Sequence, residues 1–140
     1  MLIIEDNLDD EMMLMHMLQK ARLDGHIEVV RDGKQALEHL TRDEAKVENL
    51  IALFLDLNIP TINGLQLLAM IRADDRLLHL PVIVMTSSNS PQDLQECKRL
   101  RVASYVAKPL SMATFTKAIA DVFHMPSNTS KPLEKAGLVE

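Results

Sequence analysis

The sequence predicts an α/β fold, in which a doubly wound, five-stranded parallel sheet has helices on both faces. Two observations support this prediction. Short runs rich in Ile, Val and Leu alternate along the chain with segments whose apolar residues recur at helical spacing. The chain has 140 residues, of which 47% are hydrophobic and 25% charged, enough to bury the core of one ordinary domain. Such alternation is typical of a parallel sheet that is covered on both sides.

Five short apolar runs are the predicted strands. The runs at 51–55 and 82–85 are apolar at nearly every position, as expected of central strands that are buried on both faces. The first run begins at residue 1, which is typical of a chain that has lost a few residues upstream. In chain order, the predicted strands are residues 1–4, 27–30, 51–55, 82–85 and 103–107.

A segment with helical spacing follows each predicted strand. The segment after residue 85 has the weakest apolar pattern but a well-marked start, because Ser90 can cap it, Pro91 suits its first turn and Asp93 completes a capping-box arrangement. Asn63 and Gln66 have the same spacing as Ser90 and Asp93, and they mark the start of the helical segment that follows the third strand. The apolar residues at helical spacing are Leu14, Met15, Leu18 and Ala21; Ala36, Leu37 and Leu40; Leu67, Leu68 and Ile71; Leu94, Cys97 and Leu100; and Phe115, Ala118, Ile119 and Val122.

The composition argues against several classes of partner. A net charge of −5 and only four aromatic residues, none of them Trp, disfavour binding to nucleic acid. The longest apolar run covers residues 50–55, far short of the roughly 20 residues of a membrane helix. No basic segment is followed by a long apolar stretch, so we expect no signal peptide. The single cysteine, Cys97, fits a reducing cytoplasm and is expected to be a buried helix residue. Residues 1–124 form the predicted domain, and residues 125–140 a flexible C-terminal tail.

Polar residues follow four of the predicted strands. The first strand runs into Glu5 and Asp6, the third into Asp56, the fourth into Thr86 and the fifth into Lys108. In an open parallel sheet these ends share one edge, where ligands bind. Two carboxylates about 4 Å apart repel by roughly 4 kcal/mol at an effective dielectric constant near 20. Three carboxylates against one lysine therefore either hold extra protons or bind a divalent cation, and ligands that are all oxygen favour Mg²⁺ or Mn²⁺.

This set of groups also suits a phosphoryl group. A hard cation and a lysine would neutralise phosphoryl oxygens, a hydroxyl would donate a hydrogen bond, and a carboxylate would attack phosphorus to form an acyl phosphate. Each residue alone is more often a helix cap or a solvated loop residue. Only their occurrence together at neighbouring strand ends indicates a phosphoryl-binding site.

The motifs resemble those of the receiver domain of two-component response regulators, over residues 1–124. That family implies a flavodoxin-like sheet with strand order 2-1-3-4-5. It also implies a protein that is not an enzyme beyond Mg²⁺-dependent self-phosphorylation and self-dephosphorylation. The matching segments are Leu-Ile-Ile-Glu-Asp-Asn at 2–7, Leu-Asp-Leu-Asn-Ile-Pro at 55–60, Gly64, Val-Met-Thr-Ser-Ser at 84–88 and Tyr-Val-Ala-Lys-Pro-Leu at 105–110.

The resemblance implies a role for each acidic residue at the strand ends. Asp56 would be the phosphoacceptor. Asp6 and Asp56, with the backbone carbonyl of Asn58, would coordinate Mg²⁺, for which Mn²⁺ can substitute. Glu5 would act on the ion through water.

The resemblance also assigns the remaining strand-end residues. Thr86 and Lys108 would bind the phosphoryl group, and Thr86 would be drawn towards it. Tyr105 occupies the switch position and would turn inward when Thr86 moves. The bond between Lys108 and Pro109 is usually cis in this family. Locally, Gly64 would let the next helix pack close to the loop that follows Asp56.

The expected partners follow from the same resemblance. A sensor histidine kinase would phosphorylate Asp56. The segments 29–33 and 73–77 further resemble stand-alone receivers that partner phytochrome-type kinases. Output to an unknown downstream protein would use protein contact, a homodimer through the fourth helix, fifth strand and fifth helix, or onward phosphoryl transfer. The protein is expected to be cytoplasmic, without direct binding to nucleic acid or membrane.

Methionines crowd the first predicted helix, where the kinase docks in receivers. Met13 and Met17 cannot both face the sheet together with Leu14 and Leu18, and exposed methionine suits an adaptable docking surface. The alternative interpretation is that these methionines fill gaps in the core. The five histidines show no metal-ligand spacing.

Two other functions remain open. A phosphohydrolase of the haloacid dehalogenase kind also uses an aspartate at a strand end, but it needs a second acid two residues on, where this chain has Asn58. A pseudo-receiver would act as an interaction module without phosphorylation. The complete set of acids, threonine and lysine argues against that alternative.

Overall fold

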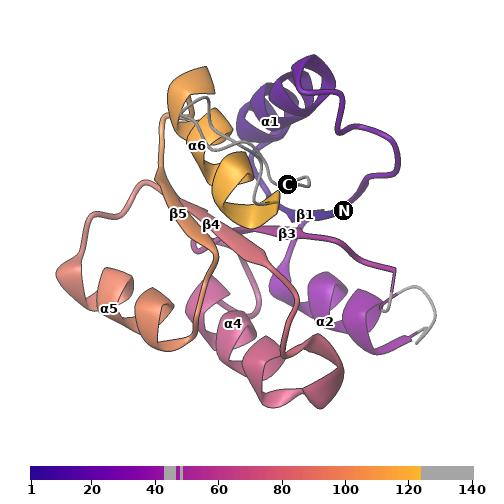
Figure 1. Ribbon diagram of the computed structural model, residues 1–140. Coiled ribbons are helices and arrows are strands. Elements are labelled where there is room, and N and C mark those ends of the chain that lie inside the picture. Colours follow the sequence, from indigo (N-terminus) through magenta and orange to yellow (C-terminus); the bar gives the residue numbers. More distant parts are fainter. Residues whose placement is uncertain (43–46, 48, 124–140) are drawn as a thin grey trace.

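The computed structural model describes residues 1–42, 47 and 49–123, so the predicted tail at 125–140 lies outside the described residues. Its strands form one parallel sheet in the order β2-β1-β3-β4-β5, which confirms the predicted fold class and strand order (Figure 1). The chain order reverses between β1 and β3. The strands are β1 (Leu2–Ile4), β2 (Glu28–Val30), β3 (Leu53–Asp56), β4 (Val82–Thr86) and β5 (Ser104–Ala107).

Helices cover both faces of the sheet (Figure 1). One face carries α1 and α6, and the other carries α2, α4 and α5. None of the described helices is long and apolar enough to cross a membrane. The bounds are α1 (Leu8–Lys20), α2 (Gly33–Arg42), α4 (Gly64–Ala73), the short 3₁₀ helix η1 (Asp75–Leu77), α5 (Pro91–Arg99) and α6 (Met112–Phe123).

The alternation of side chains along each strand divides the core into two layers. Leu53 and Leu55 pack with α2, α4 and α5, whereas Phe54 points to the opposite face, with α1 and α6. There its ring lies 6.5 Å from that of Phe115, nearly parallel to it. Because successive strand residues point to opposite faces, a strand covered on both sides is apolar throughout, which explains the unbroken apolar run.

The two predicted helix starts differ in how they are capped. Asn63 and Gln66 form a complete capping box at the start of α4. At α5, the Ser90 side chain accepts from the Asp93 amide at 3.3 Å, and Pro91 occupies the first turn, as predicted. The Asp93 carboxylate does not return to the Ser90 amide, however. It accepts instead from the Ser88 hydroxyl at 2.9 Å, so the predicted capping box is only half formed.

The methionines of α1 divide between core and surface. Met17 is 2% exposed and packs against the sheet beside Leu14 and Leu18, so it belongs to the core and not to a docking surface. Met12 and Met13 are 61% and 46% exposed. Cys97 is fully buried on α5, as predicted.

Candidate functional site

The predicted acids meet at the edge formed by the carboxyl ends of the strands, where the chain order reverses. Glu5 and Asp6 follow β1, and Asp56 is the last residue of β3. One carboxylate oxygen from each lies within 4.8 Å of the others. Glu5 and Asp56 are buried, whereas Asp6 is exposed. Three carboxylates this close repel one another unless a cation lies among them.

The Lys108 ammonium group lies among these carboxylates. Its Nζ is 2.9 Å from Asp56 Oδ2, 3.0 Å from Glu5 Oε1 and 2.7 Å from Asp10 Oδ2. The peptide bond between Lys108 and Pro109 is cis, as the resemblance to receiver domains implies. Asp10 is not among the residues predicted from the sequence. It lies in the first turn of α1 and reaches the site only because that helix begins directly beyond β1.

Burial and charge shift the pKa values of the central groups. Burial, followed by closeness to Asp56, raises the pKa of Glu5 to about 8, against the opposing effect of Lys108. Burial by itself lowers the pKa of Lys108, but hydrogen bonds to Asp10, Asp56 and Glu5 outweigh it, so the pKa is raised and the lysine is charged. The site therefore combines a charged ammonium group with a carboxyl group whose pKa is raised by burial and by the neighbouring Asp56.

A tightly packed loop holds Asp56 in place. The Asn58 amide donates to Asp56 Oδ1 at 2.9 Å. The Gly64 amide donates to the Leu57 carbonyl oxygen at 3.0 Å, and a Cβ on Gly64 would lie only 2.4 Å from Leu57 Cα. The close approach predicted for Gly64 is confirmed, since no residue with a side chain fits there without moving the loop.

The start of α2 supports the same loop from the other side. The Gly33 amide donates to the Pro60 carbonyl oxygen at 3.0 Å, and the Lys34 amide donates to Thr61 Oγ1 at 2.9 Å. Thr61 has a φ of 67°, which is unusual for a β-branched residue and is stable only where neighbours fix it.

A cavity of about 540 Å³ opens beside these groups, large enough for a phosphoryl group and a hydrated ion. Thr86 does not line it. This residue is 2% exposed at the end of β4, and its Oγ1 accepts from the Ser88 amide at 3.0 Å. The cavity is lined by Asp6, Asn7, Asp10, Asp56, Asn58, Ser87, Lys108 and Pro109.

Tyr105 is connected to Thr86 through one residue. The Tyr105 hydroxyl donates to the Ser88 carbonyl oxygen at 3.0 Å, and the ring packs against the core. Since the Ser88 amide donates to Thr86, both of these side chains hold the backbone of Ser88. A movement of Thr86 would therefore disturb the position of Tyr105.

The variant Glu5→Gln is expected to be more stable than the wild type without magnesium, by an amount that grows as the pH rises. Because the pKa of Glu5 is about 8 when folded and 4.5 ordinarily, the folded protein binds more protons than the unfolded chain between these values. The stability from this group is complete below pH 4.5 and is lost as the pH rises through about 8, at up to roughly 1.4 kcal/mol per pH unit.

Urea unfolding with a chelator present, at several pH values, measures this difference. Glu38→Gln, which removes an exposed carboxylate of α2, is the matched control. If the stabilities of wild type and Glu5→Gln run parallel across this pH range, the carboxyl group of Glu5 does not hold the proton.

The parallel sheet, with strand-end acids gathered around one lysine, has the features expected of a receiver-type signalling domain. The family model described as the response regulator receiver domain matches residues 1–120. The chain belongs to this family, whose members are switches in two-component signalling and not enzymes in the classical sense.

Three relatives illustrate the similarity. The probable methanogenesis regulatory protein FilR2 of Methanothrix harundinacea is 34% identical over 122 residues, which cover 86% of this chain and 79% of FilR2. The bacteriophytochrome response regulator RtBRR is 33% identical, with a TM-score of 0.77, over 94% of this chain and 82% of RtBRR. The Mn²⁺-bound form of response regulator Rcp1, a protein of Synechocystis, is 26% identical, with a TM-score of 0.73, over 94% and 97% of the two chains.

Proposed function

We propose that the protein is a signalling switch in which Asp56 accepts a phosphoryl group from a sensor histidine kinase. The contact of 2.9 Å between Lys108 Nζ and Asp56 Oδ2 is the main support for this proposal. It places a fixed positive charge beside the carboxylate that would carry the phosphoryl group. An Asp56 oxygen attacks phosphorus, the bond from phosphorus to the donor atom breaks, and the donor leaves with that bonding pair.

The proposed cofactor is Mg²⁺, for which Mn²⁺ can substitute. The close cluster of oxygens from Glu5, Asp6 and Asp56 supports it, because these hard ligands favour such ions. We propose that Asp6, Asp56 and the backbone carbonyl of Asn58 hold the ion directly and that Glu5 acts through water. The bound ion would neutralise phosphoryl oxygens, Lys108 would hold another of them, and Thr86 would donate its hydroxyl hydrogen.

Incubation with acetyl phosphate and Mg²⁺ tests this function. The expected result is a mass gain of one phosphate that is stable in acid and labile in base, and that is lost in Asp56→Asn and on chelation of the metal. Absence of any mass gain in the wild type would favour the pseudo-receiver and would overturn the proposal. Continuous turnover of free phosphoesters would instead favour the hydrolase.

Phosphorylation is expected to change the intrinsic fluorescence of the protein, because Tyr105 is the single tyrosine and the chain has no Trp. When Thr86 moves towards the phosphoryl group, its hydrogen bond with the Ser88 amide breaks and the contact between Ser88 and Tyr105 changes. We therefore expect Thr86→Ala to accept phosphate from acetyl phosphate with little change in tyrosine emission. If phosphorylation changes the tyrosine emission of Thr86→Ala as much as that of the wild type, Thr86 is not part of the switch.

We propose that the kinase docks on the exposed apolar side chains at the start of α1. Leu8, Met12 and Met13 are 59%, 61% and 46% exposed, and this helix also brings Asp10 to the site. The phytochrome-type kinases are the proposed class, since RtBRR is a bacteriophytochrome response regulator. The double variant Met12→Gln with Met13→Gln should slow phosphotransfer from such a kinase but not from acetyl phosphate.

Output is proposed to occur through α5, β5 and α6, by contact with a downstream protein, by homodimerisation or by onward phosphoryl transfer. Tyr105 belongs to β5, so the proposed switch residue is part of this region. The proposed location is the cytoplasm, in keeping with the buried free thiol of Cys97. Comparison of the sedimentation of the phosphorylated and unphosphorylated protein tests the dimer, because only a change on phosphorylation supports it.

A further inference from the structure

Asp10 is a charged residue of the acidic site without a role in the phosphorylation proposed above. Its Oδ2 atom lies 2.7 Å from Lys108 Nζ, closer than the oxygens of Glu5 at 3.0 Å and Asp56 at 2.9 Å. Asp10 also lines the cavity of about 540 Å³ beside Asp56. It therefore borders the space that a phosphoryl group on Asp56 would occupy.

The three carboxylates use all the hydrogen-bond donors of Lys108. An ammonium group has three N–H donors and no acceptor. The Nζ atom contacts one oxygen each of Glu5, Asp10 and Asp56. The lysine can therefore donate to a phosphoryl oxygen only when one of these contacts is weakened or given up.

The burial of the three carboxylates decides which contact is lost at the lowest cost. The side chain of Glu5 is fully buried and that of Asp56 is 5% exposed, whereas that of Asp10 is 30% exposed. A buried carboxylate that loses its cation keeps the full penalty of desolvation, but an exposed carboxylate is hydrated instead. The contact with Asp10 is therefore the one that Lys108 gives up first.

We propose that Asp10 is a positioning residue, which holds Lys108 while Asp56 is unphosphorylated and competes with the phosphoryl group for this lysine. The inference rests on the proposed phosphorylation of Asp56. The ion pair must open before the ammonium group can hold phosphoryl oxygens, so Asp10 slows phosphorylation. Once the phosphoryl group is in place the pair is already open, and Asp10 has little influence on hydrolysis. Because Asp10 lies in the first turn of α1, its hold on the lysine depends on the position of that helix.

Phosphorylation of Asp10→Asn by acetyl phosphate with Mg²⁺ tests this role. Asparagine has nearly the same shape as aspartate but no charge. We expect the variant to be phosphorylated about two- to fivefold faster than the wild type, which is the effect of losing a partly exposed ion pair. The rate of hydrolysis should stay close to the wild-type value. A general disturbance of the site would instead slow phosphorylation.

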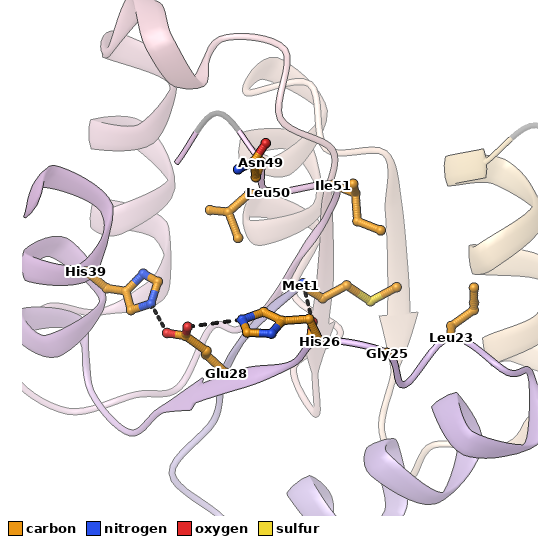
Figure 2. A pocket seen from close by; sticks show the side chains of 9 residues that line it. All are labelled: Met1, Leu23, Gly25, His26, Glu28, His39, Asn49, Leu50 and Ile51. Carbon is orange, nitrogen blue, oxygen red and sulfur yellow. Dashed lines mark hydrogen bonds and ion pairs between the residues drawn. The ribbon is translucent and has the colours of Figure 1, made fainter. Parts of the chain in front are cut away.

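Two control variants remove a carboxylate without changing this ion pair. Asp9→Asn alters the exposed neighbour of Asp10 in the same helical turn. Glu28→Gln alters a carboxylate that contacts His26 and His39 at the amino end of β2, away from the acidic site, as Figure 2 shows. Both variants should be phosphorylated at the wild-type rate, because neither changes the contacts of the lysine.

NMR of the wild type follows the ion pair directly and does not depend on how the variants fold. Binding of beryllium fluoride, a stable analogue of the phosphoryl group, with Mg²⁺ should move the carboxyl carbon signal of Asp10 towards that of the exposed Asp9. An Asp10 signal that stays in place would show that the lysine has not been released.

The outcomes separate this inference from the proposed function. If the wild type is phosphorylated and Asp10→Asn is no faster, only the role of Asp10 is wrong. If either control variant is accelerated as much as Asp10→Asn, the effect belongs to net charge and the role of Asp10 is again wrong. A wild type that takes up no phosphate would contradict the proposed function, and the role of Asp10 with it.

Discussion

Replacement of Gly64 by alanine is expected to destabilise the protein by about 2–3 kcal/mol and to slow phosphorylation of Asp56. The added Cβ would lie 2.4 Å from Leu57 Cα and 2.9 Å from the carbonyl oxygen of Asp56. These are backbone atoms, which cannot rotate away as a flexible side chain could. The helix α4 must therefore move outward, or the loop after β3 must shift, and either change displaces the carboxylate of Asp56.

Urea unfolding and the rate of phosphorylation by acetyl phosphate measure the two effects. The matched control is Gly25→Ala, because a Cβ at Gly25 would meet no atom within 4 Å. That variant should stay within about 0.5 kcal/mol of the wild type and accept phosphate at the same rate. A Gly64→Ala variant with wild-type stability would show that the loop after Asp56 is not rigid.

Replacement of Arg72 by alanine is expected to lower the free energy of unfolding by about 3 kcal/mol. Arg72 lies on α4, and its guanidinium group donates to carbonyl oxygens at the ends of two other elements, α5 and η1. The Nε atom is 2.8 Å from the Leu100 oxygen and Nη2 is 3.1 Å from that of Arg101, whereas Nη1 is 3.1 Å from the Leu77 oxygen. A further contact of 3.3 Å reaches the oxygen of Leu78.

The location of these acceptors explains the size of the effect. Burial, with a smaller effect from the Arg101 charge, lowers the pKa of Arg72. Its removal would take a donor from the carbonyl groups just after α5 and from those at the end of η1, of which the Leu77 oxygen also accepts from the Leu80 amide. Arg101 also has a φ of 58°, a conformation that neighbouring contacts must hold. Arg72 thus stabilises the backbone at the ends of two neighbouring elements, α5 and η1.

Urea unfolding of Arg72→Ala, compared with Arg99→Ala, checks this expectation. Arg99 pairs with Glu96 at 2.7 Å on the exposed side of α5, where an ion pair contributes about 1 kcal/mol or less. Equal losses of stability in the two variants would mean that the carbonyl contacts of Arg72 contribute little. Arg72→Lys should recover only part of the loss, because an ammonium group cannot reach all of these oxygens at once.

The acidic site could be predicted from the sequence because it depends on a local pattern. Each buried strand ends where its apolar run meets a polar residue, and parallel strands bring those ends to one edge. The residue order alone therefore places Glu5, Asp6, Asp56 and Lys108 together, and the observed distances among them confirm their proximity. The local start of α4 at Asn63 was equally predictable, since its capping box spans only four residues.

The sequence by itself determined which segments become strands and helices, and which side chains stand at the strand ends, because those properties depend on near neighbours. Only the tertiary structure decided which face of each helix turns inward and which distant groups meet. It buried Met17, placed Asp10 on Lys108 and brought His39 to the carboxylate that His26 also contacts. Such contacts join residues far apart in the chain and depend on how each helix is rotated and packed against the sheet, which no local spacing specifies.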